Sequence, residues 1–538
     1  MRRWNGWGDD TIEAILNEDA LAFLAGRIGP GQAPLDASFE EACAAIAPSR
    51  IAPHPLVDLS VANRALHALG QSLPDWLRLR HGRLGAVPDG VAFPESAAQV
   101  RELLAYAAAQ GASVIPYGGG TSVTGHLTVL GEQPTLCIDM RRLRALINLD
   151  RESQLATFGA GVTGPDLEAQ LRAHGYTLGH FPQSFDYSTL GGWIVTRSSG
   201  QQSLRYGRIE GLFAGGQLET PAGTLAIPTF PASAAGIDLR EMVLGSEGRL
   251  GILTEATVRV TKLPAYEAFH AVFFPDWEQA VRGVRELAQA RLPLSMLRLS
   301  NPLETQTMLA LAGHKRLVGM LETWLKLRGC GDGKCMLLLG ATGARRQARA
   351  ALREAFAIAR THGGVHMGRG LGERWRHNRF RNVYMRNTAW RHGYAIDTVE
   401  TAVDWSGVTN AMAAIEAAAT RAFGEHGERV HAYTHLSHLY PQGASVYSTF
   451  VYRLTGDYAL DVARWRSLKC AVSDAIVAAG GTISHQHGVG SDHAPWLGLE
   501  KGELGLDAMR ALFDRFDPDG RMNPGKLVLP MVTAVEKA

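Results

Sequence analysis

Apolar residues recur with a helical period in several long segments of the second half of the chain. The spacing predicts helices over residues 277–290, 345–362, 408–426 and 459–479, with strand-like runs between them. Helices that alternate with strands in this way are typical of an α+β region in which the helices pack on a sheet.

The first half of the chain has a different texture. Residues 1–89 are predicted to be helical and connective, because Asp9 and Asp10 can cap a helix over residues 11–24 and prolines interrupt the chain after it. From about residue 90 the pattern predicts, in order, a helix over 96–110 and short strands over 112–116 and 135–139.

These changes divide the chain into four expected parts. They are an N-terminal region over residues 1–89, a glycine-rich domain over 90–265, a cap domain over 266–479 and a C-terminal segment over 480–538. A chain of 538 residues is long enough for several domains, at ~100–200 residues for each.

Composition and charge exclude several classes of protein. Hydrophobic residues make up 46% of the chain and charged residues 20%, which is typical of a folded globular protein. The net charge of +2 provides no overall field for binding nucleic acid, so we expect no nucleic-acid partner. The five cysteines are widely spread, which favours a reducing compartment. Without a signal-like start or a long apolar run, we expect a cytoplasmic protein.

Three glycine-rich loops carry the first chemical signal. The first follows a predicted strand and reads Pro-Tyr-Gly-Gly-Gly-Thr-Ser-Val-Thr-Gly over residues 116–125. Contiguous glycines allow several N–H groups to approach one anion, although a tight turn explains this loop equally well by itself. A second loop at 179–200 and a third at 245–254 favour a long diphosphate ligand held from several sides. The Rossmann fingerprint is not matched, because the three glycines of the first loop are contiguous.

A second group of candidate residues lies near the C-terminus. Residues 480–490 read Gly-Gly-Thr-Ile-Ser-His-Gln-His-Gly-Val-Gly, and a strand-like Thr482 and Ile483 would present His485 and His487 on one face. Imidazoles exchange protons near neutral pH, as acid–base catalysis requires. Two structural histidines in a loop are the alternative, and the glycine loops favour the catalytic interpretation.

Together the loops resemble the FAD-binding half of the vanillyl-alcohol oxidase, or PCMH-type, flavoprotein family. The resemblance implies an α+β protein with a PCMH-type FAD-binding fold of two α+β subdomains. It also implies an α+β cap of helices on an antiparallel sheet, and a C-terminal segment that returns to the flavin. FAD would be noncovalent, because no histidine occupies the first loop. The resemblance assigns to the cofactor Pro116, Gly118, Gly119, Gly120, Thr121, Ser122, Gln183, Ser188, Thr189, Gly191, Gly192, Glu247, Gly248, Gly251 and Ile252.

Within this family the chain is most similar to the alkyldihydroxyacetonephosphate synthases, flavoenzymes of ether-lipid synthesis. The similarity runs from Trp-Asn-Gly-Trp-Gly at residues 4–8 to Asn-Pro-Gly-Lys-Leu at residues 523–527. It implies that the fatty acyl group of acyl-dihydroxyacetone phosphate is exchanged for a fatty alcohol through a flavin N5 adduct, without net redox change. A lipid-phosphate substrate is compatible with peripheral membrane contact and with a homodimer.

The same similarity assigns individual roles. Tyr447 matches a catalytic tyrosine, which acts as a base if nearby cations lower its pKa. Arg386 and Arg298 match arginines that hold substrate or lie near the flavin, although arginines commonly pair with carboxylates instead. The synthases have three consecutive histidines where this chain has His485, Gln486 and His487. We therefore expect one of the two histidines to be the acid or base and Gln486 to contact substrate.

Three alternatives remain open. An FAD-dependent D-2-hydroxy-acid dehydrogenase or oxidase, of the lactate or glycolate type, has the same fold, but Gln486 stands where such enzymes carry a metal-binding Glu. A metal site at His431, His435 and His438 requires a helix; in a strand, which we favour, His438 points away from the other two. We therefore expect no metal. A flavin-bearing binding protein without turnover is the third alternative.

Overall fold

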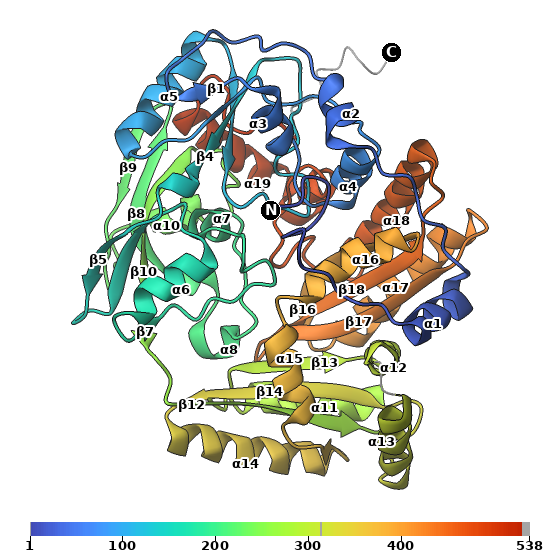
Figure 1. Ribbon diagram of the computed structural model, residues 1–538. Helices are drawn as coiled ribbons and strands as arrows, with labels where there is room; N and C mark the ends of the chain where they lie inside the picture. Colours follow the sequence, from blue (N-terminus) through green and yellow to red (C-terminus); the bar gives the residue numbers. More distant parts are fainter. Residues whose placement is uncertain (1, 313–314, 530–538) are drawn as a thin grey trace.

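The computed structural model describes residues 2–312 and 315–529 (Figure 1). In this part of the chain the strands form four sheets, and the three larger ones organise the molecule. Two of them form the FAD-binding half predicted from the glycine loops, and the largest forms the cap.

The first subdomain is built on a four-stranded sheet with the order β1-β2-β4-β3. Strands β2, β4 and β3 are parallel, and Ser96 caps helix α5 (Ala97–Ala109) as the pattern predicts. The strands are β1 (Val57–Asp58), β2 (Gly90–Ala92), β3 (Ser113–Tyr117) and β4 (Thr135–Asp139). Because β1 precedes residue 89, the N-terminal region contributes directly to this sheet.

The second subdomain contains a five-stranded antiparallel sheet with the order β5-β6-β10-β8-β9. Its strands are β5 (Leu146–Asp150), β6 (Leu155–Gly159), β8 (Phe213–Thr220), β9 (Gly223–Ile227) and β10 (Ile252–Arg259). The main helices beside it are α6 (Gly164–Arg172), α7 (Leu190–Val195) and the short α8 (Ser203–Tyr206) and α9 (Ile209–Leu212). Strands β7 (Tyr176–Thr177) and β11 (Thr261–Lys262) form a separate pair.

The cap is a seven-stranded antiparallel sheet with the order β15-β12-β14-β13-β17-β18-β16. Its strands are β12 (Tyr266–Phe274), β13 (Met296–Ser300), β14 (Cys335–Gly343), β15 (Val365–His366), β16 (Tyr394–Asp404), β17 (Val430–Leu439) and β18 (Gly443–Arg453). The four predicted helices are present as α11 (Trp277–Gln289), α14 (Arg345–Thr361), α17 (Val408–Gly424) and α18 (Tyr458–Ala478).

Alternate side chains of the cap strands face in opposite directions, as the period of a strand requires. On β14, Leu337 and Leu339 belong to the apolar core shared with the cap helices, whereas their neighbours Met336 and Leu338 line a cavity on the other face. Further helices at the cavity and the cap edge are α12 (Pro302–Leu311), α13 (Lys315–Leu327), α15 (Gly370–Asn378) and α16 (Met385–Arg391).

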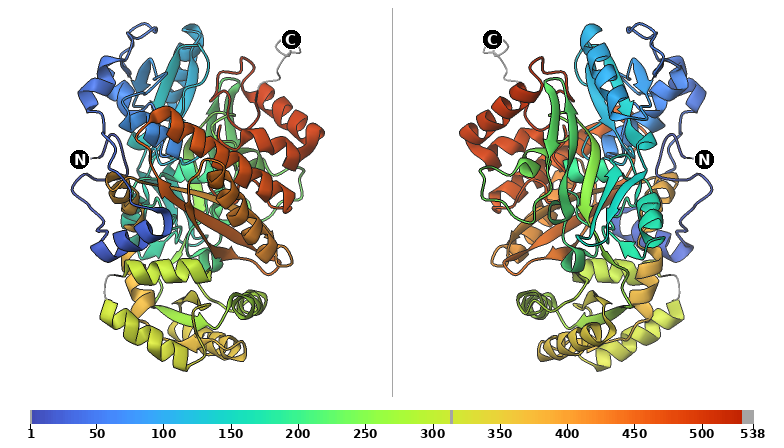
Figure 2. Two further views of the ribbon diagram at one scale, coloured as in Figure 1. Left: turned by 90° about the vertical axis from the view of Figure 1, so that its right-hand side faces the viewer. Right: turned by 90° about the vertical axis from the view of Figure 1, so that its left-hand side faces the viewer.

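Both ends of the described chain connect the two halves. The N-terminal helix α1 (Glu18–Ile28) packs on β17 and α12 of the cap, and α4 (Leu73–Arg80) packs on α18 and β16 of the cap. Helices α2 (Phe39–Ala44) and α3 (Val61–Leu66) lie near the first subdomain. The side views in Figure 2 show the C-terminal helix α19 (Ala494–Phe516) beside the FAD-binding half. Beyond it, Met522 pairs with Val114, and Asn523 N donates to the Val114 oxygen at 2.8 Å. The predicted C-terminal return is therefore confirmed.

Two local predictions are wrong. The helix expected over residues 11–24 begins only at Glu18, because Asn17 provides the cap, whereas Asp9 binds Thr11 in a turn. The strand expected at Thr482 and Ile483 is irregular, because the Ile483 N–H donates to the Glu500 carboxylate instead of a neighbouring strand. Across residues 2–312 and 315–529, none of the helices combines the length and the apolar character that crossing a bilayer requires.

Candidate active site

A cavity of about 680 Å³ lies where the FAD-binding half meets the cap. Its walls on one side are the three glycine-rich loops, and on the other the strands β13, β14, β17 and β18 with the segment from α15 to α16. All fifteen residues assigned to the cofactor line this cavity, as do Tyr447, His487, Arg386, Arg298 and Gln486. His485 does not line it.

Glycine is required where the first two loops meet. A Cβ atom on Gly119 would lie 1.9 Å from the main-chain carbonyl oxygen of Tyr187, and one on Gly118 would lie 2.3 Å from Thr189 Oγ1. Gly120 adopts a φ of +62°, which other residues rarely adopt. The two loops therefore lie in direct contact and form a continuous wall of the cavity.

The third loop is held by its own side chain. The buried Glu247 carboxylate accepts from the N–H groups of Val489 and Gly490 at 2.6 and 2.8 Å, and lies 3.0 Å from His126 Nε2. This carboxylate therefore ties the C-terminal segment to the FAD-binding half. Gly248 follows it with a φ of +79°, and a Cβ there would lie 3.0 Å from Pro116.

Tyr447 lies at the centre of the cap wall. On the neighbouring strands its register partners are Glu400 on β16 and His435 on β17. Its ring stacks on His435 with 4.8 Å between centroids and meets the His487 ring edge-on at 5.6 Å. Burial raises the pKa of Tyr447 to about 12, and the opposing effect of Arg386 is smaller. The condition for Tyr447 to act as a base, a pKa lowered by nearby cations, is therefore not met, and Tyr447 is a neutral phenol at neutral pH.

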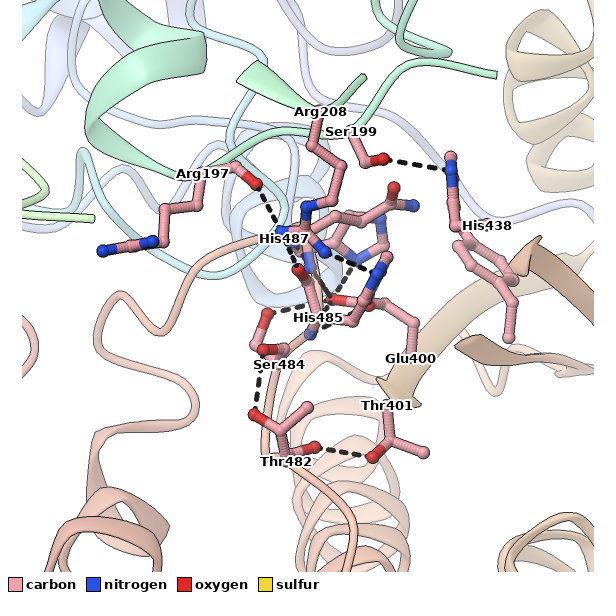
Figure 3. A network of polar contacts seen from close by, with 12 residues as sticks. Arg197, Ser199, Arg208, Glu400, Thr401, His438, Thr482, Ser484, His485 and His487 are labelled. Atoms are coloured by element: carbon pink, nitrogen blue, oxygen red, sulfur yellow. Dashed lines mark hydrogen bonds and ion pairs between the residues drawn. The ribbon is translucent and has the colours of Figure 1, made fainter. Parts of the chain in front are cut away.

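A loop of the C-terminal segment wraps around the carboxylate of Glu400 (Figure 3). The N–H groups of His485, Gln486 and His487 each donate to this carboxylate at 3.0 Å, and Ser484 Oγ donates at 2.9 Å. Burial opposes the charge, but these donors and the two histidines hold the pKa of Glu400 well below its usual range. Glu400 therefore fixes the loop that carries the candidate acid–base residues.

The two histidines of this loop face different surroundings. His485 Nε2 lies 2.6 Å from Arg208 Nη1 (Figure 3) and 2.6 Å from the Tyr440 hydroxyl. A guanidinium can only donate, so Nε2 is an acceptor and the imidazole is neutral. His487 instead lines the cavity with a side chain 21% exposed, and burial lowers its pKa although Glu400 acts to raise it.

Arg298 is neutralised within the cap. Its Nη2 donates to Glu304 Oε1 at 2.6 Å and lies 3.1 Å from His435 Nδ1. Burial disfavours the Glu304 carboxylate, but Arg298 and His435 outweigh it and lower the pKa of Glu304 to about 2. The position of His435 beneath Tyr447 therefore depends on a buried ion pair.

Arg386 faces the same cavity from α16. Its guanidinium lies over the Trp76 ring at 4.4 Å, and Nη1 donates to the main-chain carbonyl oxygen of Gln71 at 2.8 Å. Burial lowers its pKa, partly offset by Asp397 and Tyr447. Its side chain is among those that line the cavity.

The histidines of β17 do not behave as a regular strand predicts. His438 lies at a bulge with a φ of +48°, and it lines the cavity on the same side as His435. The expectation that it points away is therefore wrong, because the bulge shifts the alternation. His438 Nδ1 lies 3.0 Å from the hydroxyls of Ser199 and Ser203. Within the described ranges, no three His, Cys, Asp or Glu side chains are grouped as metal ligands.

Sequence reasoning missed Glu400 and Arg208, and it considered His435 as a metal ligand. Glu400 lies in β16 without a recognisable motif, and the loop residues that bind it are 84 or more positions away in the chain. Because Asp397, Thr398 and Thr401 in the same strand are also polar, nothing in the strand's composition singles out Glu400.

The cavity fits FAD. Its wall includes contiguous glycines, hydroxyls of Thr121, Ser122, Ser188 and Thr189 that can bind ribityl and phosphate oxygens, and an apolar cap face. The side-chain oxygens of Gln201 and Gln486 are buried there without a partner among the described residues, as expected of groups that contact a polar ligand.

The comparisons with known proteins agree with this geometry. The family described as FAD binding domain matches residues 88–227, and the family described as FAD linked oxidases, C-terminal domain, matches residues 263–527. The alkyldihydroxyacetonephosphate synthase of Dictyostelium discoideum is 32% identical over 88% of this chain and 79% of its own length. The chain belongs to the alkyldihydroxyacetonephosphate synthase family.

Other relatives support the assignment to this family. The synthase of Trypanosoma brucei brucei is 28% identical over 98% of this chain and 92% of its own. A solved alkyldihydroxyacetonephosphate synthase is 26% identical, with a TM-score of 0.82 over 97% of this chain and 98% of its own. p-Cresol methylhydroxylase shares the fold at 13% identity, with a TM-score of 0.69 over 89% and 95% of the two chains. The predicted PCMH-type fold is therefore confirmed, and the chain is an FAD-dependent enzyme.

Proposed function

We propose that the enzyme exchanges the fatty acyl group of acyl-dihydroxyacetone phosphate for a fatty alcohol. The observation that carries this proposal is the convergence of Tyr447, His487 and Arg386 on the cavity shared with the FAD loops. The family relationship supports it, and the cavity's substrate is accordingly a small molecule. When bound, FAD supplies the reactive ring at which the substituents on substrate carbon C1 are exchanged.

His487 is the proposed base for the C1 proton. It is the titratable member of the C-terminal loop that lines the cavity, and its lowered pKa keeps it unprotonated at neutral pH. His485 is engaged by Arg208 outside the cavity. Tyr447 would donate a hydrogen bond to substrate oxygen, since burial keeps it protonated.

The proposal is tested with purified, FAD-loaded protein incubated with acyl-dihydroxyacetone phosphate and hexadecanol. We expect ether product and released fatty acid in equal amounts. Absence of product from fully loaded enzyme would contradict the proposal. The hydroxy-acid alternative predicts instead that D-lactate or glycolate bleaches the flavin under anaerobic conditions; glycolate oxidase subunit GlcD of Bacillus subtilis is 24% identical over 82% of this chain and 89% of its own.

We also propose peripheral contact with a membrane through α13. Its exposed apolar residues Leu317, Met320, Trp324 and Leu327 recur at helical spacing. The cations Arg316 and Arg328 flank them, as in helices that lie in an anionic lipid surface. The preceding helix α12 lines the cavity with the apolar residues Met308 and Leu311.

Cosedimentation with phosphatidylserine-containing vesicles tests this contact. We expect Met320→Glu to reduce the bound fraction severalfold, because a charge replaces an apolar group that enters the lipid. The control is Leu504→Glu, which changes a leucine 84% exposed on α19. Equal loss in both variants would contradict the proposal. The homodimer and the compartment stay predictions.

A further inference from the structure

Arg379 follows the last turn of α15 and has no polar partner for two of its donor atoms. Nε and Nη1 are both buried, and within the described ranges neither makes a hydrogen bond. No carboxylate in those ranges lies within ion-pair distance of this guanidinium; Glu267 acts on it only from farther away. Burial lowers the pKa of Arg379 to about 10, which still leaves the group charged. A buried cation of this kind is costly unless an anion joins it.

The other arginines on the cavity wall already have polar partners; the exposed Arg374 donates from Nη2 to the Ala312 carbonyl oxygen at 3.2 Å. Arg298 is paired with Glu304 at 2.6 Å, and Arg386 donates to the Gln71 oxygen. The carboxylate of Asp397 accepts from Trp465 Nε1 at 3.0 Å. Glu247 is held by the N–H groups of the C-terminal segment. None of these carboxylates neutralises Arg379.

Aromatic rings hold the Arg379 guanidinium in place. It lies 4.7 Å from the ring centroid of Phe181 and 4.8 Å from that of Phe380, with Trp375 at 5.9 Å. Rings on several sides limit the side-chain freedom that a ligand would otherwise have to restrict. Phe181 belongs to the second glycine-rich loop, so Arg379 connects the cap wall to the FAD side. Figure 1 shows α15 at this boundary.

We propose that Arg379 binds the phosphate group of the substrate. This deepens the proposed function and rests on it for the identity of the substrate, but the chemistry is that of a phosphate monoester of any kind. A phosphate dianion supplies the acceptors that Nε and Nη1 lack, and guanidinium–phosphate hydrogen bonds are strong because both groups are charged. Asn378 and Asn382 line the same wall and offer further donors.

The test measures ligand binding to the FAD-loaded enzyme without catalysis. Dihydroxyacetone phosphate and glycerol 3-phosphate are the probes, dihydroxyacetone is the unphosphorylated control, and the flavin spectrum or calorimetry reports Kd. We expect Arg379→Gln to raise the Kd of both phosphates at least about tenfold and to leave that of dihydroxyacetone unchanged. Arg379→Lys should lie between the two, because it keeps the charge and loses the planar donors.

Arg381→Gln provides the matched control, because Arg381 is exposed two positions further on and lies outside the cavity. It should bind both phosphates as the unaltered enzyme does. Unchanged phosphate affinity in Arg379→Gln would overturn the proposal. Loss of FAD from that variant would also overturn it, by assigning Arg379 to the cofactor. If phosphate binding depends on Arg379 but no ether product forms, the phosphate site stands and the proposed reaction fails.

Discussion

Glu400 is the side chain on which the geometry of the candidate catalytic loop depends. Three consecutive N–H groups point at its carboxylate, so the loop is folded around a single charge. The same charge opposes the effect of burial on the pKa of His487. One residue therefore positions the proposed base and adjusts its protonation.

Replacing Glu400 with glutamine removes the charge and turns an amide NH₂ toward N–H donors. We expect kcat to fall about 100-fold, because small displacements of catalytic groups cost this much. Without the carboxylate the pKa of His487 falls further, so the acidic limb of the kcat/KM profile should move to lower pH. Rate measurements across pH check both effects.

Glu416→Gln is the control for this variant. Glu416 is also a carboxylate in the cap, where it accepts from Thr434 Oγ1 at 2.7 Å and Asn301 Nδ2 at 2.9 Å, away from the cavity. The activity of the Glu416→Gln variant should stay within about twofold of that of the unaltered enzyme, as for substitutions that do not touch the site. An unshifted pH profile in Glu400→Gln would contradict the positioning role.

The Tyr447→Phe variant removes the hydroxyl and keeps the ring, so it tests the role of the hydroxyl alone. The ring would still stack on His435, and the hydroxyl's partner in the fold is Thr398 Oγ1 at 3.3 Å. We expect stability to change little and kcat to fall ~100-fold or more, as when a positioned hydrogen-bond donor to a substrate oxygen is removed. Tyr433→Phe, also on the cavity wall, should retain most activity. Equal losses in both variants would show that the phenol of Tyr447 has no special role.

At the scale of elements, the glycine loops act by packing against one another. Gly119→Ala places a Cβ 1.9 Å from the Tyr187 oxygen, so the first two loops must separate. We expect FAD affinity to fall at least about tenfold, because backbone groups on both loops lose their relative positions. The measurement is FAD content after dialysis, compared with Gly211→Ala, where a Cβ meets nothing within 4 Å. Full retention of FAD by Gly119→Ala would contradict this account.

Local signals account for what the sequence predicted correctly. The helix over 96–110 has its Ser96 cap and its apolar period in adjacent residues, and it is present as α5. The predicted cap helices agree equally well, because their periods are long. The predicted start of the first helix is wrong because both Asp9 and Asn17 can cap a helix. Packing of α1 on the cap favours the start at Asn17.

The same distinction between local and non-local signals applies to the residues that line the cavity. The glycine loops were predictable because each is a contiguous motif. The environments of Tyr447 and His485 were not, since they depend on pairing between β16 and β18 and on contacts with Arg208. A pKa is set by burial and by neighbours in space, and neither can be read from spacing along the chain.

At the scale of the whole molecule, the folded state holds several histidines in their neutral form. Burial lowers the pKa of His180 to about 3 and that of His431 to about 4, and it holds the pKa of His438 and of His493 well below the ordinary value. These residues lie in both halves of the protein, so their protonation affects the stability of the whole structure.

The sign of the pH dependence follows from this burial. In the unfolded chain these histidines bind protons below pH ~6.5, whereas in the folded state they do not, so the free energy of unfolding decreases as the pH falls. Each contributes about 1.4 kcal/mol between pH 7.5 and 5.5. Asp492 opposes part of this loss, because burial raises its pKa to about 6 and folding then favours its protonated form.

His431 allows this dependence to be isolated, because it lies away from the FAD loops and contacts Thr307 and Phe23. The thermal midpoint of the FAD-loaded enzyme should be lower at pH 5.5 than at pH 7.5, and His431→Gln should reduce that difference, since the amide keeps a hydrogen bond to Thr307 but does not titrate. His426→Gln, at an exposed position, should leave the difference unchanged. A midpoint that rises on acidification would mean that raised carboxylate pKa values, with Asp492 foremost, outweigh the buried histidines.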